Sequence, residues 1–155
     1  MKKFMMTALA GTLLCTTAVA EDWYLYAPTE KIWYFFNLDE LQCSGTVCQT
    51  WDASIATNKY HDFRLARIAV DCENGRTKSL GEYNYRKGKL DSTIARESAW
   101  LYPPPNTVGR NMIVTICDPN SRNPDNYLRF ASLLNDVPNV KKAIRHFEEQ
   151  NQTNR

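Results

Sequence analysis

Four cysteines that follow an apolar N-terminal leader constrain the fold of this chain more than any other feature. An exported chain meets an oxidising compartment, where an even number of cysteines usually forms disulfides. Three pairings of Cys43, Cys48, Cys72 and Cys117 are possible. Cys43 and Cys48 flank a short turn-like segment containing Gly45, so a local bridge that pinches a hairpin is the most economical choice. Cys72 and Cys117 are then left for each other.

A bridge from Cys72 to Cys117 would close a long loop. In the chain-entropy model it would stabilise the fold by roughly 3 to 4 kcal/mol. A zinc site is the competing interpretation of four cysteines, but their spacing contains no CxxC pair and export favours disulfides over zinc. We therefore predict two disulfides, no metal site and no cofactor.

The first 20 residues have the features of a secretory signal peptide. A short basic start precedes a mostly apolar run to Cys15, and Ala18 and Ala20 are small residues at the two positions that a signal peptidase reads. The apolar run is shorter than the roughly 20 residues that span a bilayer, so no transmembrane anchor is expected. Cys15 raises the alternative of a lipid-modified lipoprotein, but Leu14 stands where that processing normally needs Gly, Ala or Ser. We expect an exported chain that begins at Glu21.

The leader carries the small excess of positive charge in this sequence. It contains Lys2 and Lys3 and no acid, so the 19 basic residues of the whole chain fall to 17 and equal the 17 acids. A neutral exported chain is a poor partner for nucleic acid. Charge is nevertheless uneven along it: residues 21–58 carry six acids and one base, whereas residues 59–89 carry eight bases and four acids.

Residues 21–102 carry the patterns of β-strands. Aromatic and β-branched residues crowd the segments "DWYLYA", "KIWYFFNL" and "TVCQTW". The segment "FRLARIAVDC" alternates, with Ile68, Val70 and Cys72 on one face. A turn at "ENG" leads to "RTKSLGEYNY", the returning strand of a hairpin. Residues 90–102 follow as another strand-like segment, after a turn centred on Gly88.

A short helix is predicted between the prolines at 103–105 and Cys117. Adjacent prolines cannot lie inside a helix, and Asn106 or Thr107 can cap the helix that follows by accepting backbone N–H bonds. A bridge from Cys117 to Cys72 would hold this helix, which is marginal by itself in water, against the sheet. Its apolar residues share one face, and they are Val108, Met112, Ile113 and Ile116.

Residues 119–155 form an extension that begins as a loop and then has apolar residues at helical spacing. We predict two short amphipathic helices that dock on the sheet and cover its open face or edge. The alternative is a homodimer or partner surface formed by these C-terminal helices. The apolar positions are Tyr127, Phe130, Ala131 and Leu134 in the first helix and Val140, Ile144 and Phe147 in the second.

The predicted fold class is therefore α+β. It consists of an antiparallel β-sheet with a short helix tied to it by a disulfide, plus a C-terminal helical tail. The predicted organisation is a signal peptide at 1–20, one domain at 21–118 and a helical extension at 119–155.

The order of these segments resembles the bacterial surface-adhesin protein E family over about residues 22–118. That family has a similar run of strands, then a Trp, a Pro pair, a Val-Gly helix start and a final Cys. The resemblance implies an antiparallel sheet with a helix tied on by a bridge from Cys72 to Cys117, and an exported, non-enzymatic protein that binds host matrix and plasma proteins. The matching residues are Trp23, Gly45, Val47, Trp51, Asp71, Cys72, Trp100, Pro104, Pro105, Val108, Gly109 and Cys117.

Catalysis is not predicted from these residues. His61 and His146 are the two histidines, the first in a polar turn and the second in a charged helix, and neither lies beside a convincing nucleophile and acid. No HExxH, GxSxG or Gly-rich phosphate loop is present. No cysteine stays free once two bridges form.

The basic middle of the chain is the predicted partner-binding surface. Arg and Tyr are enriched at protein interfaces, and a cluster of bases suits acidic protein segments or glycosaminoglycans. The alternative is a solvated sheet face whose bases are neutralised by the acids of residues 21–58. The candidate residues were predicted on two successive strands with interleaved tyrosines, and they are Lys59, Arg64, Arg67, Arg76, Lys78, Tyr83 and Tyr85.

Two functions follow from these features. The first is an adhesin-like protein, at the cell surface or secreted, that binds an extracellular host protein through the basic strands. The second is a periplasmic protective or partner-binding protein, such as an inhibitor of a foreign enzyme or an envelope assembly factor.

Overall fold

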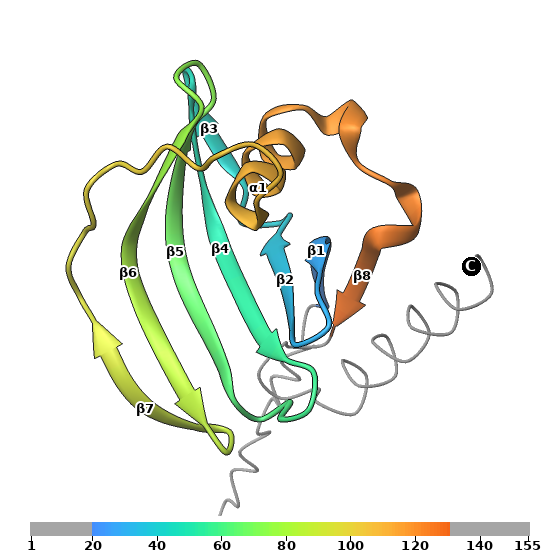
Figure 1. The fold of residues 1–155 in the computed structure, drawn as a ribbon, viewed down its shortest axis with the longest axis vertical. Helices are drawn as coiled ribbons and strands as arrows, with labels where there is room; N and C mark the ends of the chain where they lie inside the picture. Colours follow the sequence, from blue (N-terminus) through green and yellow to red (C-terminus); the bar gives the residue numbers. More distant parts are fainter. Residues whose placement is uncertain (1–19, 131–155) are drawn as a thin grey trace, which may run out of the picture.

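The computed structural model describes residues 20–130, which form an antiparallel sheet with a helix packed on one face (Figure 1). The sheet order is β7-β6-β5-β4-β2-β1-β8, with β3 paired to β4 outside this path. The strands are β1 (Glu21–Pro28), β2 (Ile32–Asn37), β3 (Gln42–Ser44), β4 (Val47–Ala56), β5 (Phe63–Asp71), β6 (Arg76–Arg86), β7 (Lys89–Ile94) and β8 (Tyr127–Phe130). The helices are α1 (Val108–Cys117) and the short 3-10 helices η1 (Pro119–Ser121) and η2 (Pro124–Asn126). The predicted combination of an antiparallel sheet and a disulfide-tied helix is confirmed.

Side chains alternate between the two faces of the sheet, and each face carries its own apolar cluster. On one face, which we call the helix face, Tyr24, Phe36, Ile68 and Val70 pack with Met112, Ile113 and Ile116 of α1. On the opposite face, which we call the tryptophan face, the cluster consists of Trp23, Leu25, Trp33, Phe35, Ala53, Ile55 and Phe63. Trp23 and Trp33 are therefore core residues, whereas Trp51 and Trp100 are half-buried.

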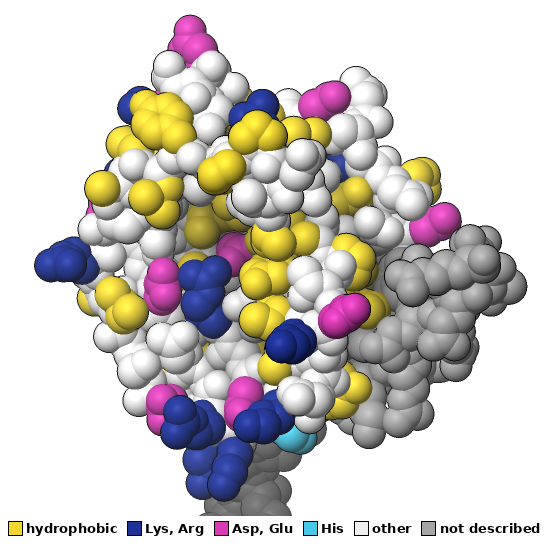
Figure 2. Space-filling model, viewed as in Figure 1, with side chains coloured by type: hydrophobic (Ala, Val, Ile, Leu, Met, Phe, Trp, Pro, Cys, Tyr) yellow, Lys and Arg dark blue, Asp and Glu magenta, His cyan; other side chains and the backbone are white. Residues whose placement is uncertain are grey.

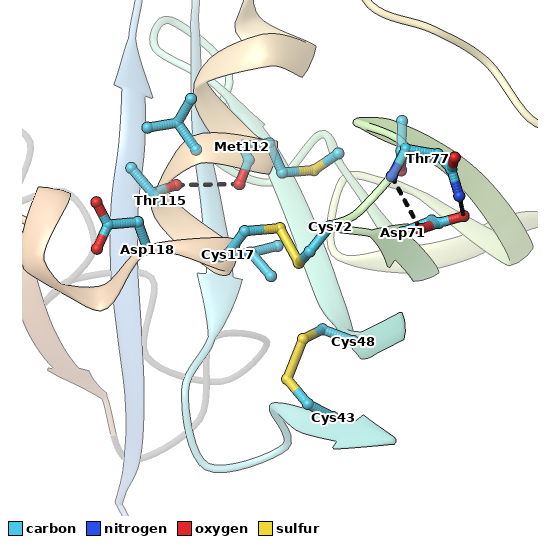
Figure 3. Close-up of a disulfide and its surroundings, with 12 residues drawn as sticks. Cys43, Cys48, Asp71, Cys72, Thr77, Met112, Thr115, Cys117 and Asp118 are labelled. Carbon is cyan, nitrogen blue, oxygen red and sulfur yellow. Dashed lines mark hydrogen bonds between the residues drawn. A yellow bond between two sulfur atoms is a disulfide. The ribbon is translucent and has the colours of Figure 1, made fainter. Parts of the chain in front are cut away.

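Helix α1 begins and ends where the sequence predicts. Thr107 is its N-cap, and its hydroxyl accepts a hydrogen bond from the Arg110 backbone N–H at 3.3 Å. Cys117, in its last turn, forms a disulfide with Cys72 directly after β5 (Figure 3). The helix of ten residues would be marginal alone, so burial of its apolar face and this bridge hold it on the sheet.

The second disulfide joins Cys43 and Cys48, as predicted. These two cysteines face each other in the register of β3 and β4 (Figure 3). Gly45 lies in the tight turn between them with a φ of +59°, a left-handed conformation that glycine adopts without steric cost. Two disulfides indicate an oxidising environment outside the cytoplasm. Within residues 20–130, no helix has the length and apolar character needed to cross a membrane.

The extension differs from the prediction in its first part. Tyr127 and Phe130, which were predicted to lie on a helix, belong to β8, which pairs with β1. This pairing satisfies the outer backbone groups of β1, and Arg129 adds an ion pair to Asp22. A helix of the same residues would leave that edge open. The remaining positions of the two predicted helices lie at 131–155, outside the described residues, as does the predicted signal peptide.

Two further segments differ from their predicted form. The strand predicted over 90–102 ends at Ile94 in β7, and residues beyond it lie irregularly until Leu101 forms a single bridge with Thr77. Lys59, predicted on a strand, lies in the turn between β4 and β5. In both places backbone hydrogen bonding to neighbouring segments, rather than side-chain alternation, sets the end of the strand.

Candidate functional site

The seven candidate residues do not form one surface. Arg64 lines a hollow on the helix face beside Met112. Arg67 lies on the opposite face, where its guanidinium stands 5.8 Å from the Trp51 ring. Lys59 is in the turn before β5 and not on a strand. The sequence alone does not place these residues because adjacent strand positions point to opposite faces and the register is set by pairing.

Each candidate basic residue on β5 and β6 has an acidic partner. Arg67 pairs with Glu40, Arg76 with Asp71 and Lys78 with Glu97. Arg64 pairs with Asp52 at 2.7 Å and with Glu82 at 3.2 Å. Glu40 and Asp52 belong to the acidic segment 21–58, as expected for a sheet that neutralises its own charge. The candidate cations on β5 and β6 therefore do not form a patch of unpaired positive charge.

The two candidate tyrosines pack on the tryptophan face of the sheet. Tyr85 stacks on Phe63, with ring centroids 4.4 Å apart and an angle of 12° between ring planes. Tyr83 lies 5.9 Å from the Trp51 ring and is more exposed than Tyr85. Cross-strand aromatic pairs of this kind stabilise a sheet. Their packing explains the interleaved tyrosines without a ligand.

A second aromatic group lies beside the first residues of β6. The Trp100 ring lies under two cations, with Arg76 at 4.7 Å and Lys78 at 5.1 Å from its centroid. The Tyr102 hydroxyl stands 3.4 Å from a terminal nitrogen of Arg76. Leu101 and Tyr102 are 60% and 64% exposed. We call this group, Arg76, Lys78, Trp100, Leu101 and Tyr102, the Trp100 surface.

Backbone hydrogen bonds hold the Trp100 surface rigidly against β6. Thr77 and Leu101 exchange two of them, at 2.9 and 2.8 Å, and the Ser98 N–H donates to the Ser79 carbonyl at 2.9 Å. Leu101 and Tyr102 were not among the binding residues predicted from the sequence. The available signal was the run "WLY" before three prolines: an irregular segment that carries large aromatic residues outside the alternating strands.

The helix face contains a hollow of about 300 Å³ below α1 (Figure 2). A buried acid, Asp52, lies at its floor, where it accepts hydrogen bonds from the Tyr26 hydroxyl at 2.6 Å and from Arg64 at 2.7 Å. Burial raises the pKa of Asp52, and the nearby Arg64 opposes this. Burial, followed by the negative charge of Asp52, raises the pKa of the Tyr26 hydroxyl well above its usual value.

This network is chemically satisfied. Within residues 20–130 every buried side-chain polar atom has a hydrogen-bond partner. The same residues contain no group of three or more His, Cys, Asp or Glu side chains placed to hold a metal ion. His61 lies exposed in the turn before β5, and His146 lies outside the described residues. The Asp52 network therefore joins β1, β4, β5 and β6 across the helix face.

Comparison with known proteins places this chain in no family. No protein-family model, no curated protein and no solved structure matches it.

Proposed function

We propose that this chain is an exported, non-enzymatic binding protein of the surface-adhesin E type, which binds an extracellular host protein. Its contact surface is the Trp100 surface, which contains two of the basic residues selected from the sequence, Arg76 and Lys78. Support for export comes from the two disulfides and from the features of the leader. The resemblance of residues 22–118 to the adhesin family supplies the class of partner.

The observation that carries the proposal is the composition and rigidity of the Trp100 surface. Trp, Tyr and Arg are the residue types that dominate binding energy at protein interfaces. Here Trp100 and Tyr102 contact Arg76, and exposed Leu101 lies between them in sequence. Because backbone bonds to β6 already order this segment, a partner would pay little conformational entropy to bind it.

The binding test uses residues 21–155 and a panel of immobilised extracellular-matrix and plasma proteins. The variant carries Leu101→Ser and Tyr102→Ser, two exposed positions whose backbone bonds are kept. We expect binding to at least one matrix protein and a loss of at least tenfold in the variant. A matched control carries Leu90→Ser and Val114→Ser, at exposed apolar positions on β7 and α1, and should bind within twofold of wild type. Binding to no panel member, or equal losses in both variants, would contradict the proposal.

The location test treats intact cells with a protease that cannot cross the outer membrane. Cleavage of the chain on intact cells, or its recovery from washed medium, is the expected result. Protection on intact cells with cleavage after lysis would place the chain in the periplasm and favour the second function predicted above, a protective or partner-binding protein of the envelope.

A further inference from the structure

We propose that the end of the sheet opposite the Trp100 surface binds a sulfated polysaccharide. The surface consists of two hairpin ends. The first is the turn at residues 57–62 between β4 and β5, and the second is residues 86–89, which are the last residue of β6, the turn itself and the first residue of β7. We call this surface the hairpin-end surface. It lies at the other end of β6 from Arg76, about 33 Å away for a strand of eleven residues. The inference does not depend on the proposed function.

Hydrogen bonds join the two turns into one unit. The Gly88 N–H donates to the His61 carbonyl at 2.9 Å, and the Lys87 N–H donates to Asp62 Oδ1 at 2.8 Å. The start of the turn at residues 57–62 is also held in place, because the Thr57 N–H donates to the Lys31 carbonyl at 2.9 Å. The basic side chains on these turns are therefore presented from a fixed backbone.

Positive charge at this surface is not neutralised by the fold. Lys59, Arg86, Lys87 and Lys89 are exposed, and none of them forms an ion pair with any residue at 20–130. Asp62 is the one acid on the two turns, and it already accepts the Lys87 backbone N–H. Asp91 is the nearest further acid along the chain. Figure 2 shows Lys and Arg side chains gathered beside the histidine at the lower edge of the view.

The conformation of Lys87 is a second, independent observation. Its φ is 52°, followed by 73° at Gly88, so both residues of this turn are left-handed. Asn-Gly is the sequence that such a turn prefers, and a long side chain at its first position is strained. Strain that is kept at an exposed position points to a role for the side chain itself. Here the retained side chain is a cation that extends from the tip of the hairpin.

The chemistry of the surface fits a polyelectrolyte better than a protein partner. Three of its four cations are lysines, and Lys is depleted at the centre of protein interfaces. Sulfate esters repeat along an extended polysaccharide and stay charged at all physiological pH values, so several can approach adjacent lysines together. Binding of this kind is electrostatic and weakens steeply with salt. A neutral mature chain has no general positive field, so the binding is confined to this surface.

The test measures binding of residues 21–155 to heparin in 0.15 M NaCl and the salt concentration that releases the chain. The variant carries Lys59→Ser and Lys87→Asn. The control carries Arg96→Ser and Arg110→Ser, which remove the same charge from exposed cations elsewhere that also lack ion pairs within the described part of the chain. We expect the variant to bind at least tenfold more weakly and the control to stay within twofold. Asn suits the left-handed turn, so the thermal midpoint of the variant should not fall.

Competition separates the possible ligands. Soluble heparin should displace the chain at concentrations at which an unsulfated polysaccharide and single-stranded DNA do not. The proposal is overturned if wild type fails to bind heparin at 0.05 M NaCl, if both variants weaken equally, or if DNA competes as well as heparin. The variant with Leu101→Ser and Tyr102→Ser should bind heparin as wild type does, whether or not it loses binding to matrix proteins. The two proposals can therefore fail separately.

Discussion

The basic residues of this protein fall into two groups that their sequence does not distinguish. Each cation of β5 and β6 before Arg86 meets an acid, whereas the cations of the hairpin-end surface meet none among the described residues. The first group lies on paired strands, where cross-strand and cross-sheet neighbours neutralise it. The second group lies at the hairpin ends, either in a turn or at the strand residue next to it. A run of basic residues therefore offers free positive charge to a ligand only where tertiary contacts leave that charge unpaired.

The largest effect that tests this comparison should come from Arg64. In Arg64→Ser the buried carboxylate of Asp52 loses its cation. We expect about 3 kcal/mol of lost unfolding free energy by urea denaturation, the low end for a broken buried pair because the Arg64 side chain is 33% exposed. The loss should shrink as the pH falls and Asp52 is protonated. The double variant with Arg64→Ser and Asp52→Asn should recover part of this loss. If the losses of the two single variants simply add in the double variant, Arg64 and Asp52 are not coupled.

A pH-dependent effect is expected at Asp71. Hydrogen bonds from Asn74, and then from Arg76, lower the pKa of this carboxyl below its ordinary 3.8. Its charged form therefore stabilises the fold above that pH, and the contribution is lost as the pH falls through the lowered value. Asp71→Asn should lower the thermal midpoint at pH 7, and the difference from wild type should narrow below pH 3.8. A difference that stays constant with pH would mean that the charge of Asp71 is not the cause.

A small effect is expected at Arg67. Its ion pair with Glu40 spans 3.6 Å, and the Glu40 side chain is half exposed. Exposed pairs contribute about 0.5 kcal/mol, and the contact with Trp51 adds a similar amount at most. Arg67→Ser should thus lower the unfolding free energy by about 0.5 to 1 kcal/mol. A loss as large as that of Arg64→Ser would show that burial of the ion pair does not determine how much each paired cation stabilises the fold.

The smallest effect on stability is expected at Lys87. No ion pair within residues 20–130 is lost in Lys87→Asn, and Asn relieves the left-handed turn. The unfolding free energy should stay within about 0.5 kcal/mol of wild type while heparin binding weakens. A clear loss of stability would show that the Lys87 side chain serves the fold. The variants of Arg64, Arg67 and Lys87 together rank these three cations by their contribution to the stability of the fold.

Local sequence signals predicted much of this fold. Runs of aromatic and β-branched residues predicted β1, β2 and β4, and alternation with a turn signal predicted β5 and β6, whereas β3 was predicted only as part of a cysteine-bridged hairpin. The prolines with Asn106 or Thr107 predicted the start of α1. These signals were sufficient because they act between near neighbours. The pairing of Cys43 with Cys48 was predictable for the same reason. Tyr127 to Phe130 were predicted wrongly because four residues with mixed spacing suit a strand or a helix equally, and only the open edge of β1 decides between them.

The candidate site was less predictable. Basic and tyrosine residues were selected by their closeness in sequence, but β5 directs Arg64 to the helix face and Arg67 to the tryptophan face. Trp100, Leu101 and Tyr102 were not selected because they follow the last predicted turn and have no alternating partner strand. Their position depends on one bridge to Thr77, which is a contact between residues 24 positions apart.

The sequence by itself determined the cysteine content, the alternation of the strands and the cap of α1, because each depends on covalent chemistry or on residues a few positions apart. Tertiary structure alone decided which face each cation occupies, which acid neutralises it and which cations stay unpaired. The physical reason is that charge acts through space and is cancelled by whatever the fold brings within a few ångströms. Strand register and turn position, which are set by long-range pairing, therefore separate the cations that acids neutralise from the cations whose charge stays unpaired.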